Sequence, residues 1–510
     1  MIISLSVLVI TIIVSGTYAL YKAQLSKNIG VNTTTHGLAY YINYVKGTDI
    51  TAATLNPSTS YEGGASSDIE FWKKDDSYDI YGKIELTVNT IGTNLSNSPA
   101  LKYAVVNNGN VLKEGSLKGT TSGSKVTILK NLYLEQTKQI YTVYVWLDNS
   151  EELGNISNES LSISVDCTAS LQKEPTAADT IISLYTSAAK VTATNNSITY
   201  NTAPSVSLMN DRLGGTTTSL DGGNIRYYGA SPNNYIYFNC SDYSNQTSST
   251  CETWRIIGVF DGKLKLIKSE SIGAYSWDNK DTSTGAENDT GKNDWTTARL
   301  MKLLNPSNYY KVDSNDNNLG QSLYYNSASG KCYSGQNNAT VDCDFTSTGI
   351  KNAETRNMIA ETTYYLGGWN NVSVYPNQIY EYERGTTVYS GRPTTWKGKI
   401  ALAYPSDYGY AADLNQCKDK TLYDYDNRTC TSNNWMKAII TNNGSNTGWL
   451  LTPRSGSSSN AWYVNSGGFV SRDSIAYVAY GAVPVLSLSS ELGIESGGDG
   501  SSSKPYKLSA

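Results

Sequence analysis

Charged and aromatic side chains gather near the C-terminus, and their types favour ligand recognition over catalysis. Residues 448–489 read GWLLTPRSGSSSNAWYVNSGGFVSRDSIAYVAYGAVPVLSLS. Arginine and aspartate supply charge and hydrogen bonds, whereas tyrosine and tryptophan supply stacking area, a mixture typical of surfaces that bind proteins or glycans. The candidate ligand-binding residues are Arg454, Trp462, Arg472, Asp473, Tyr477 and Tyr480.

The last part of this stretch also fits a second interpretation, an ordinary strand that closes the core. Ile475, Tyr477 and Ala479 alternate along the chain, so one face of such a strand would be buried. The sequence leaves the binding surface and the core strand open as alternatives.

Most nucleophilic and metal-dependent chemistries lack the residues they need. His36 is the only histidine, so a Ser-His or Cys-His pair has no base, and a His-based zinc site no ligands, in the rest of the chain. Residues 313–320, DSNDNNLG, resemble a calcium loop, but the glycine at the sixth position is missing and Tyr324 replaces an acidic ligand. We therefore expect no catalytic residue, metal or cofactor, although two unidentified carboxylates could form a glycosidase pair.

Six of the seven cysteines form three pairs that are close in sequence. Each pair would close a short polar loop, and in an oxidising compartment such a disulfide stabilises the fold by about 2–3 kcal/mol. The predicted disulfide cysteines are Cys240 with Cys251, Cys332 with Cys343, and Cys417 with Cys430. The remaining Cys167 shares a strand face with Val165, which predicts a buried, unreactive thiol.

Residues 1–27 are predicted to be a signal peptide or a membrane anchor. An uncharged run covers residues 2–20, a length on the border between the two, and Thr17 and Ala19 precede a suitable cleavage point. We therefore expect an exported protein, secreted or held at the membrane by this segment if it is not cleaved. The net charge of -5 and the charged fraction of 17% argue against a nucleic-acid partner.

The rest of the chain divides by pattern into three parts. Residues 28–168 alternate with a period of two, as in GKIELTVNT and YTVYVWL, which predicts a β-sandwich. Residues 169–195 contain a helical pattern after Pro175 and are predicted to be a linker with a helix. In residues 196–510, strand-like runs are mixed with helix patterns over 294–305, 353–368 and 433–440, which predicts an α+β domain.

Several motifs of the large domain resemble a known family. GNIRYYGASPNNYIYFN, WRIIGVF, SIGAYSWDN, ALAYPSDYGYAAD and YGAVPVLSLSSEL are similar to a domain of unknown function in exported proteins of gut Firmicutes, over about residues 200–510. The resemblance implies the formylglycine-generating-enzyme-like branch of the C-type-lectin fold, with ligand contacts in the loops between the last strands. This chain departs from the family at Val483, where an arginine is usual, and it lacks the calcium-sugar motif of true C-type lectins.

Functions from three classes remain compatible with the sequence. The first is a cell-surface adhesin or ligand-binding protein that recognises a glycan or a surface protein through its C-terminal domain. The second is an extracellular hydrolase that uses two carboxylates. The third is a structural matrix protein that associates through the edge strands of its sandwich.

Overall fold

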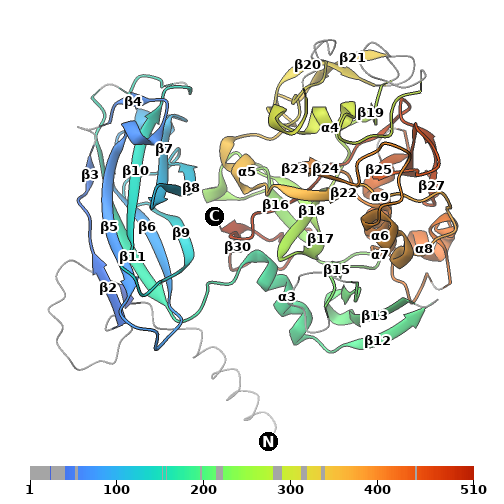
Figure 1. Cartoon of the computed structure of the whole chain (residues 1–510), viewed down its shortest axis with the longest axis horizontal. Helices are drawn as coiled ribbons and strands as arrows, with labels where there is room; N and C mark the ends of the chain where they lie inside the picture. Colours follow the sequence, from blue (N-terminus) through green and yellow to red (C-terminus); the bar gives the residue numbers. More distant parts are fainter. Residues whose placement is uncertain are drawn as a thin grey trace, which may run out of the picture. The chain divides into compact units, whose positions relative to one another are not determined.

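The computed structural model describes residues 23–24 and 41–509, except residues 52–54, 152, 157, 196–197, 214–221, 280–289, 312–318, 335–338, 418 and 443–444. The chain divides into two compact units, Met1–Glu174 and Pro175–Ala510, drawn in Figure 1. In the described residues, each unit has hydrophobic core clusters of its own, with no members from the other unit. Of the predicted segment 1–27, only residues 23–24 are described.

The first unit is formed by two sheets with mainly antiparallel strands (Figure 1). One sheet has the order β1 (Ala23–Gln24), β11 (Leu161–Ser170), β6 (Tyr81–Ile91), β9 (Lys125–Tyr133), with β3 (Ile50–Thr51) on β11. The other has the order β2 (Ile42–Val45), β5 (Ala65–Lys73), β10 (Ile140–Asp148), β7 (Leu101–Asn107), β8 (Asn110–Ser116), with β4 (Pro57–Ser58) on β10. The short helix α2 (Thr93–Asn97) follows β6.

Strand alternation explains this core. Leu86 on β6, Val143 on β10 and Val165 on β11 all point inward and are buried, while their neighbours along each strand are more exposed. Cys167 lies in the same core, and burial raises the pKa of its thiol well above the ordinary value. A thiol held in its protonated form is a poor nucleophile, so Cys167 is a packing residue.

The second unit is organised around a nine-stranded sheet (Figure 1). Its order is β12 (Val191–Asn195), β13 (Ile198–Ala203), β14 (Leu208–Asn210), β15 (Ile225–Tyr227), β17 (Glu252–Phe260), β18 (Lys263–Lys268), β29 (Val485–Ser487), β24 (Ile400–Ala401), with β16 (Tyr235–Phe238) on β17. A five-stranded sheet has the order β19 (Ala274–Ser276), β28 (Ala479–Gly481), β25 (Gly448–Pro453), β26 (Asn460–Val464), β27 (Val470–Ile475).

Three two-stranded sheets and several short helices complete the second unit. The strand pairs are β20 (Ser329–Tyr333) with β21 (Thr340–Asp344), β22 (Thr362–Tyr365) with β23 (Thr395–Gly398), and β30 (Gly493–Ile494) with β31 (Leu508–Ser509). The helices are α3 (Ala177–Ser187), α4 (Arg299–Leu304), α5 (Ala353–Met358), α6 (Pro376–Arg384), α7 (Pro405–Tyr410), α8 (Arg428–Ser432) and α9 (Trp435–Thr441).

The predicted α+β class is wrong, because the protein is β-rich, with 39% strand and 16% helix. Two of the predicted helices are much shorter than their patterns suggested. The pattern over 353–368 divides into α5 and the strand β22, whose residues Thr362–Tyr365 are β-branched and aromatic and therefore favour an extended backbone. The pattern over 294–305 begins with a turn, and α4 itself covers only Arg299–Leu304.

Most of the segment predicted as a linker, residues 175–195, belongs to the second unit, whereas residues 169–170 end β11 in the first unit. Helix α3 begins with a capping box between Thr176 and Asp179, and the backbone N–H of Ala177 donates to the carbonyl of Leu492. Ile181 and Tyr185 are buried in the core of this unit, and β12 pairs with β13 at the edge of the large sheet. The segment is thus packed as part of the fold.

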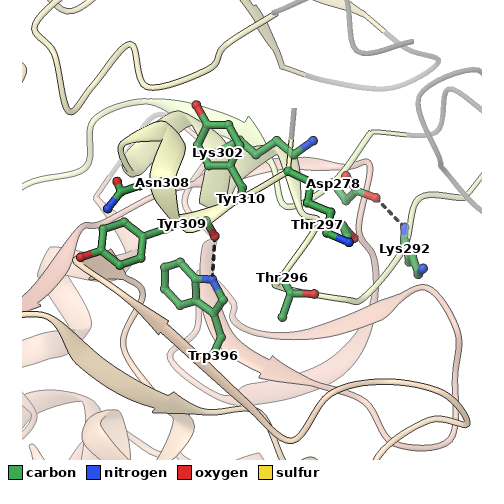
Figure 2. Close-up of a pocket in the computed structure, with 10 residues that line it drawn as sticks. Asp278, Lys292, Thr296, Thr297, Lys302, Asn308, Tyr309, Tyr310 and Trp396 are labelled. Carbon is green, nitrogen blue, oxygen red and sulfur yellow. Dashed lines mark hydrogen bonds between the residues drawn. The ribbon is translucent and has the colours of Figure 1, made fainter. Parts of the chain in front are cut away.

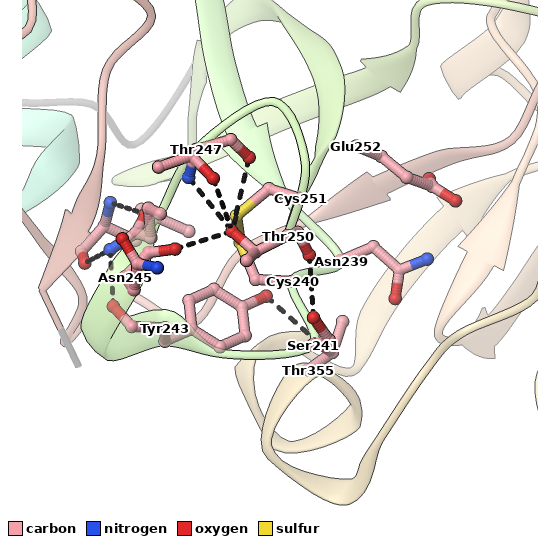
Figure 3. The surroundings of a disulfide bond; sticks show 12 residues. Asn239, Cys240, Ser241, Tyr243, Asn245, Thr247, Thr250, Cys251, Glu252 and Thr355 are labelled. Carbon is pink, nitrogen blue, oxygen red and sulfur yellow. Dashed lines mark hydrogen bonds between the residues drawn. A yellow bond between two sulfur atoms is a disulfide. The ribbon is translucent and has the colours of Figure 1, made fainter.

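The three predicted cysteine pairs are disulfides in the structure. Cys240–Cys251 connects the end of β16 to the start of β17 (Figure 3), and Cys332–Cys343 crosslinks β20 to β21. Cys417–Cys430 connects the segment before α8 to Cys430 within that helix. Because such bonds persist in oxidising compartments, the protein is non-cytoplasmic. None of the helices in the described residues is long and apolar enough to span a membrane.

Candidate functional site

A cavity of about 650 Å³ lies in the second unit, beside α4 and β23. Its described lining combines hydroxyl, amide and ammonium groups with aromatic rings, as Figure 2 shows. The lining residues are Asp278, Lys292, Thr296, Thr297, Lys302, Asn308, Tyr309, Tyr310, Lys311 and Trp396. Volume and composition are those of a pocket for a small polar ligand.

An aromatic wall forms one side of the cavity. Trp396 on β23 donates its indole N–H to the carbonyl oxygen of Tyr309 at 3.2 Å, which fixes both residues (Figure 2). The hydroxyl group of Tyr309 donates to Glu361 at 3.1 Å, and that of Tyr310 shares a hydrogen bond with Ser322 at 2.7 Å. Trp396 is almost completely buried, whereas the two tyrosines are only partly buried. The buried Trp396 therefore holds Tyr309 in place, and the rings of Tyr309 and Tyr310 are partly accessible in the cavity.

The turn before α4 supplies hydrogen-bonding groups to the cavity. The carboxylate of Asp294 accepts hydrogen bonds from the backbone N–H of Thr296 at 3.0 Å and from its hydroxyl at 2.6 Å. This turn holds Thr296 and Thr297 toward the cavity. The ammonium group of Lys302, on α4, lies 5.8 Å from the ring centroid of Tyr310, so a cation and an aromatic ring meet at this end.

Asp278 is the one carboxylate among the described residues of the lining. It accepts hydrogen bonds from the backbone N–H of Lys292 at 2.8 Å and of Arg299 at 3.2 Å. Burial raises the pKa of Asp278 to about 6, although these donors and the charge of Arg299 favour the ionised form. Its role in the structure is to tie the start of α4 to the backbone at Lys292.

The charged residues predicted near the C-terminus form a cluster at β27. The guanidinium group of Arg454 donates to Asp473 at 2.5 Å and to the side chain of Asn370 at 2.7 Å. Arg472 donates to the carbonyl oxygen of Asn370 at 2.8 Å and to Asp473 at 3.2 Å. These contacts crosslink the strands to the loop at Asn370, so both arginines hold the local structure together, and Asp473 remains about half exposed.

The aromatic residues predicted near the C-terminus separate in the structure. Trp462 is 0% exposed in the core beneath β26, so the expectation that it contacts a ligand at the surface is wrong. Tyr480 is partly buried, with its ring 4.7 Å from that of Trp449 and 5.4 Å from that of Tyr463. Tyr477 lies in the turn between β27 and β28, where its carbonyl oxygen accepts a hydrogen bond from Ser276 at 2.7 Å. These residues do not line the cavity of Figure 2.

Sequence reasoning did not find the cavity. Its residues come from two parts of the chain, the segment from Asp278 to Lys311 and the distant Trp396, and no local pattern shows that they meet. The sequence held one partial sign, because Trp277 and Trp295 precede the amphipathic segment from Thr296 to Lys311. In the structure, the ring centroid of Trp295 lies 5.1 Å from that of Trp277 and 6.3 Å from that of Trp396.

No family model and no curated protein matches the chain. Among solved structures, a chain of the PBCV-1 virus capsid, in a quasi-atomic model, aligns at 12% identity with a TM-score of 0.13. The alignment covers 42% of this chain and 60% of the capsid chain. A likeness of that degree carries no argument about fold or function, so the resemblance to the exported domain family stays a prediction.

Proposed function

We propose that the protein is an exported ligand-binding protein of the cell surface that holds a glycan in the cavity of Figure 2. The observation that carries the proposal is the composition of the lining. Partly buried tyrosine rings line it together with hydroxyl, amide and ammonium groups. Sugars offer C–H faces that stack on aromatic rings and hydroxyl groups that need hydrogen-bond partners, so the lining matches both kinds of sugar surface.

Binding is supported better than cleavage at this position. Hydrolysis with two carboxylates requires a pair about 5–9.5 Å apart that flanks the scissile bond. The described lining offers the carboxylate of Asp278 alone, and backbone N–H groups already occupy it. The proposal includes attachment to the cell surface through residues 1–27, which requires that this segment is not cleaved.

The proposal is tested on a glycan array, followed by calorimetric titration of the best glycan. Tyr309→Ala removes a stacking ring, and Lys311→Ala removes an exposed ammonium group at the rim. We expect roughly a two- to tenfold loss of affinity for Tyr309→Ala, because a contact of one aromatic ring contributes about 0.5–1.5 kcal/mol, and a smaller loss for Lys311→Ala.

Tyr423→Ala is the matched control, because it removes a tyrosine that is 47% exposed and lies outside the cavity. This variant should bind like the wild type. Arg472→Ala and Tyr477→Ala report on the alternative location at the C-terminal strands. A loss of binding in these two variants, with Tyr309→Ala unchanged, would overturn the assignment to the cavity.

A further inference from the structure

A second, smaller cavity of about 110 Å³ lies where α6 and β22 meet strand β18 of the large sheet. It is separate from the cavity of Figure 2, and the two share no lining residue among those described. The residues that matter for its chemistry are Lys265, Thr362, Tyr365, Tyr380, Arg384 and Tyr404. With Tyr364, which also lines the cavity, two cations thus share a small space with four tyrosines.

The aromatic rings hold both cations in position. The guanidinium carbon of Arg384 lies 3.4 Å from the ring centroid of Tyr380 and 5.2 Å from that of Tyr365. The ammonium group of Lys265 lies 4.6 Å from the ring centroid of Tyr404. Such contacts restrict the side chains, so the cations are arranged before any ligand arrives.

Arg384 keeps one edge of its guanidinium group unused. Its Nη1 donates to the carbonyl oxygen of Tyr380 and to Glu383, both at 3.3 Å. Its Nε and Nη2 make no hydrogen bond to any described residue, and the side chain is 22% exposed. These two N–H groups point the same way and match the two oxygen atoms of a carboxylate.

Two further donors face the same space. The ammonium group of Lys265 has three N–H bonds, and Asp407 is its hydrogen-bond partner among the described residues. The hydroxyl group of Thr362 is buried and has no partner in the described structure. A buried polar group without a partner is costly, so an acceptor in the cavity would satisfy a donor that the fold leaves open.

The charge around the cavity also favours an anion. Lys265 and Arg226 are balanced by Asp407 and Asp211, all of them buried. The partner of Arg384 is Glu383, whose pKa burial raises to about 7, so this carboxyl group is partly neutral near neutral pH. Arg384 then lacks a full counter-charge. Asp261 is the one acid among the described residues of the lining, and it is exposed in the β17–β18 turn, where water screens it.

We propose that this cavity binds the carboxylate of a small organic acid, held by the free edge of Arg384 and by the donors of Lys265 and Thr362. The volume suits an acid of a few heavy atoms, and the tyrosine rings contact its apolar part. This site is independent of the glycan cavity, so either assignment can fail without the other.

Acetate is the probe that tests the proposal, titrated into the whole protein and followed by saturation-transfer NMR and by thermal unfolding, with chloride at equal ionic strength as the reference. We expect acetate to raise the unfolding temperature of the wild type above the chloride reference. Arg384→Gln should weaken acetate binding at least tenfold, and Arg384→Lys, which keeps the charge but not the fork, should weaken it several-fold. Arg428→Gln, at an exposed arginine on α8, should bind like the wild type.

Thr362→Val keeps the shape of the side chain and removes only its hydroxyl group, so the test does not depend on the arginine variants folding. We expect weaker acetate binding in this variant, without a lower unfolding temperature in the absence of acetate. Acetate that acts no differently from chloride, or acts equally on Arg384→Gln and Arg428→Gln, would overturn the proposal. Binding of inorganic phosphate in preference to acetate would overturn the assignment to a carboxylate.

Discussion

Asp407 organises the buried charges of the second unit. It accepts hydrogen bonds from Arg226 at 3.1 Å, from Lys265, and from the backbone N–H of Tyr404 at 3.0 Å. Burial alone would raise the pKa of Asp407, but Lys265 and Arg226 hold it below the ordinary value. Removing one partner of such a group leaves the others buried without a counter-charge, which typically costs 3–5 kcal/mol. The network is therefore a poor place for substitutions that test binding.

Glu383 differs from Asp407, because burial raises its pKa from 4.5 to about 7 while Arg384 and Ser406 only partly favour its charge. Between these two pH values the folded protein keeps a proton that the unfolded chain releases, so Glu383 makes the fold less stable as the pH rises from 4.5 to 7. Glu383→Gln removes this dependence. The unfolding free energy of the variant minus that of the wild type should therefore be larger at pH 8 than at pH 4, by roughly 1–3 kcal/mol.

Urea unfolding of wild type and variant at the two pH values measures this difference. The groups that face Glu383 are Arg384 on its own helix and Ser406 and Asp407 on α7, and all three stay in both proteins. Glu381→Gln, on an exposed position of the same helix, is the control and should show no such change. An effect of Glu383→Gln that is the same at pH 4 and pH 8 would show that its carboxyl group does not titrate in this range.

Local signals in the sequence were enough for the elements that carry strong patterns. Strand alternation predicted β6 and β10, and the three disulfides followed from cysteine spacing. Helices α6 and α7 were missed because they are short and polar, although a proline stands in the first turn of each. These two helices position Arg384 and Asp407, so the small cavity could not be predicted from the sequence. Such short helices form because distant segments pack around them, and the helix propensity of their own residues is not enough to predict them.

The disulfides should differ in their contribution to stability according to their surroundings. Cys332 and Cys343 join two strands whose other residues are mostly exposed, and the pair closes a short loop. Replacing both by serine should cost about 2–3 kcal/mol of unfolding free energy. Cys240 and Cys251 belong to the same core cluster, but their bond connects β16 to β17, a central strand of the large sheet most of whose residues are buried. Loosening this connection disturbs more core packing, so the same double replacement should cost more.

Denaturant unfolding of both double variants without reductant measures this order. Hydrogen exchange should show faster exchange confined to β20 and β21 in the first variant, and in the second a wider loss of protection that includes β16 and β17. An equal loss of stability in both variants would mean that loop closure alone sets the contribution of each bond.

At the scale of the whole molecule, the second unit contains both cavities and a core drawn only from its own residues. The start of this unit differs between sequence and structure, because the sequence predicts a domain from residue 196 and the structure begins the unit at Pro175. The helix pattern after Pro175 predicts a helix in a linker between two domains. Periodicity shows which face of a helix is apolar, but it does not show which core buries that face. In the structure, the apolar face of α3 belongs to the second unit.

Two fragments that differ only in this segment test the boundary. A fragment of residues 175–510, produced under oxidising conditions, should unfold in one cooperative transition and keep the glycan and acetate affinities of the whole protein. A fragment of residues 196–510 lacks α3 and β12, so the core loses Ile181 and Tyr185 and the carbonyl of Leu492 loses its donor. Burying two such side chains contributes roughly 3–5 kcal/mol, which is a large part of the stability of a domain. Calorimetry should therefore show a much lower unfolding temperature for the shorter fragment, whereas equal stability of the two would mean that residues 175–195 act only as a linker.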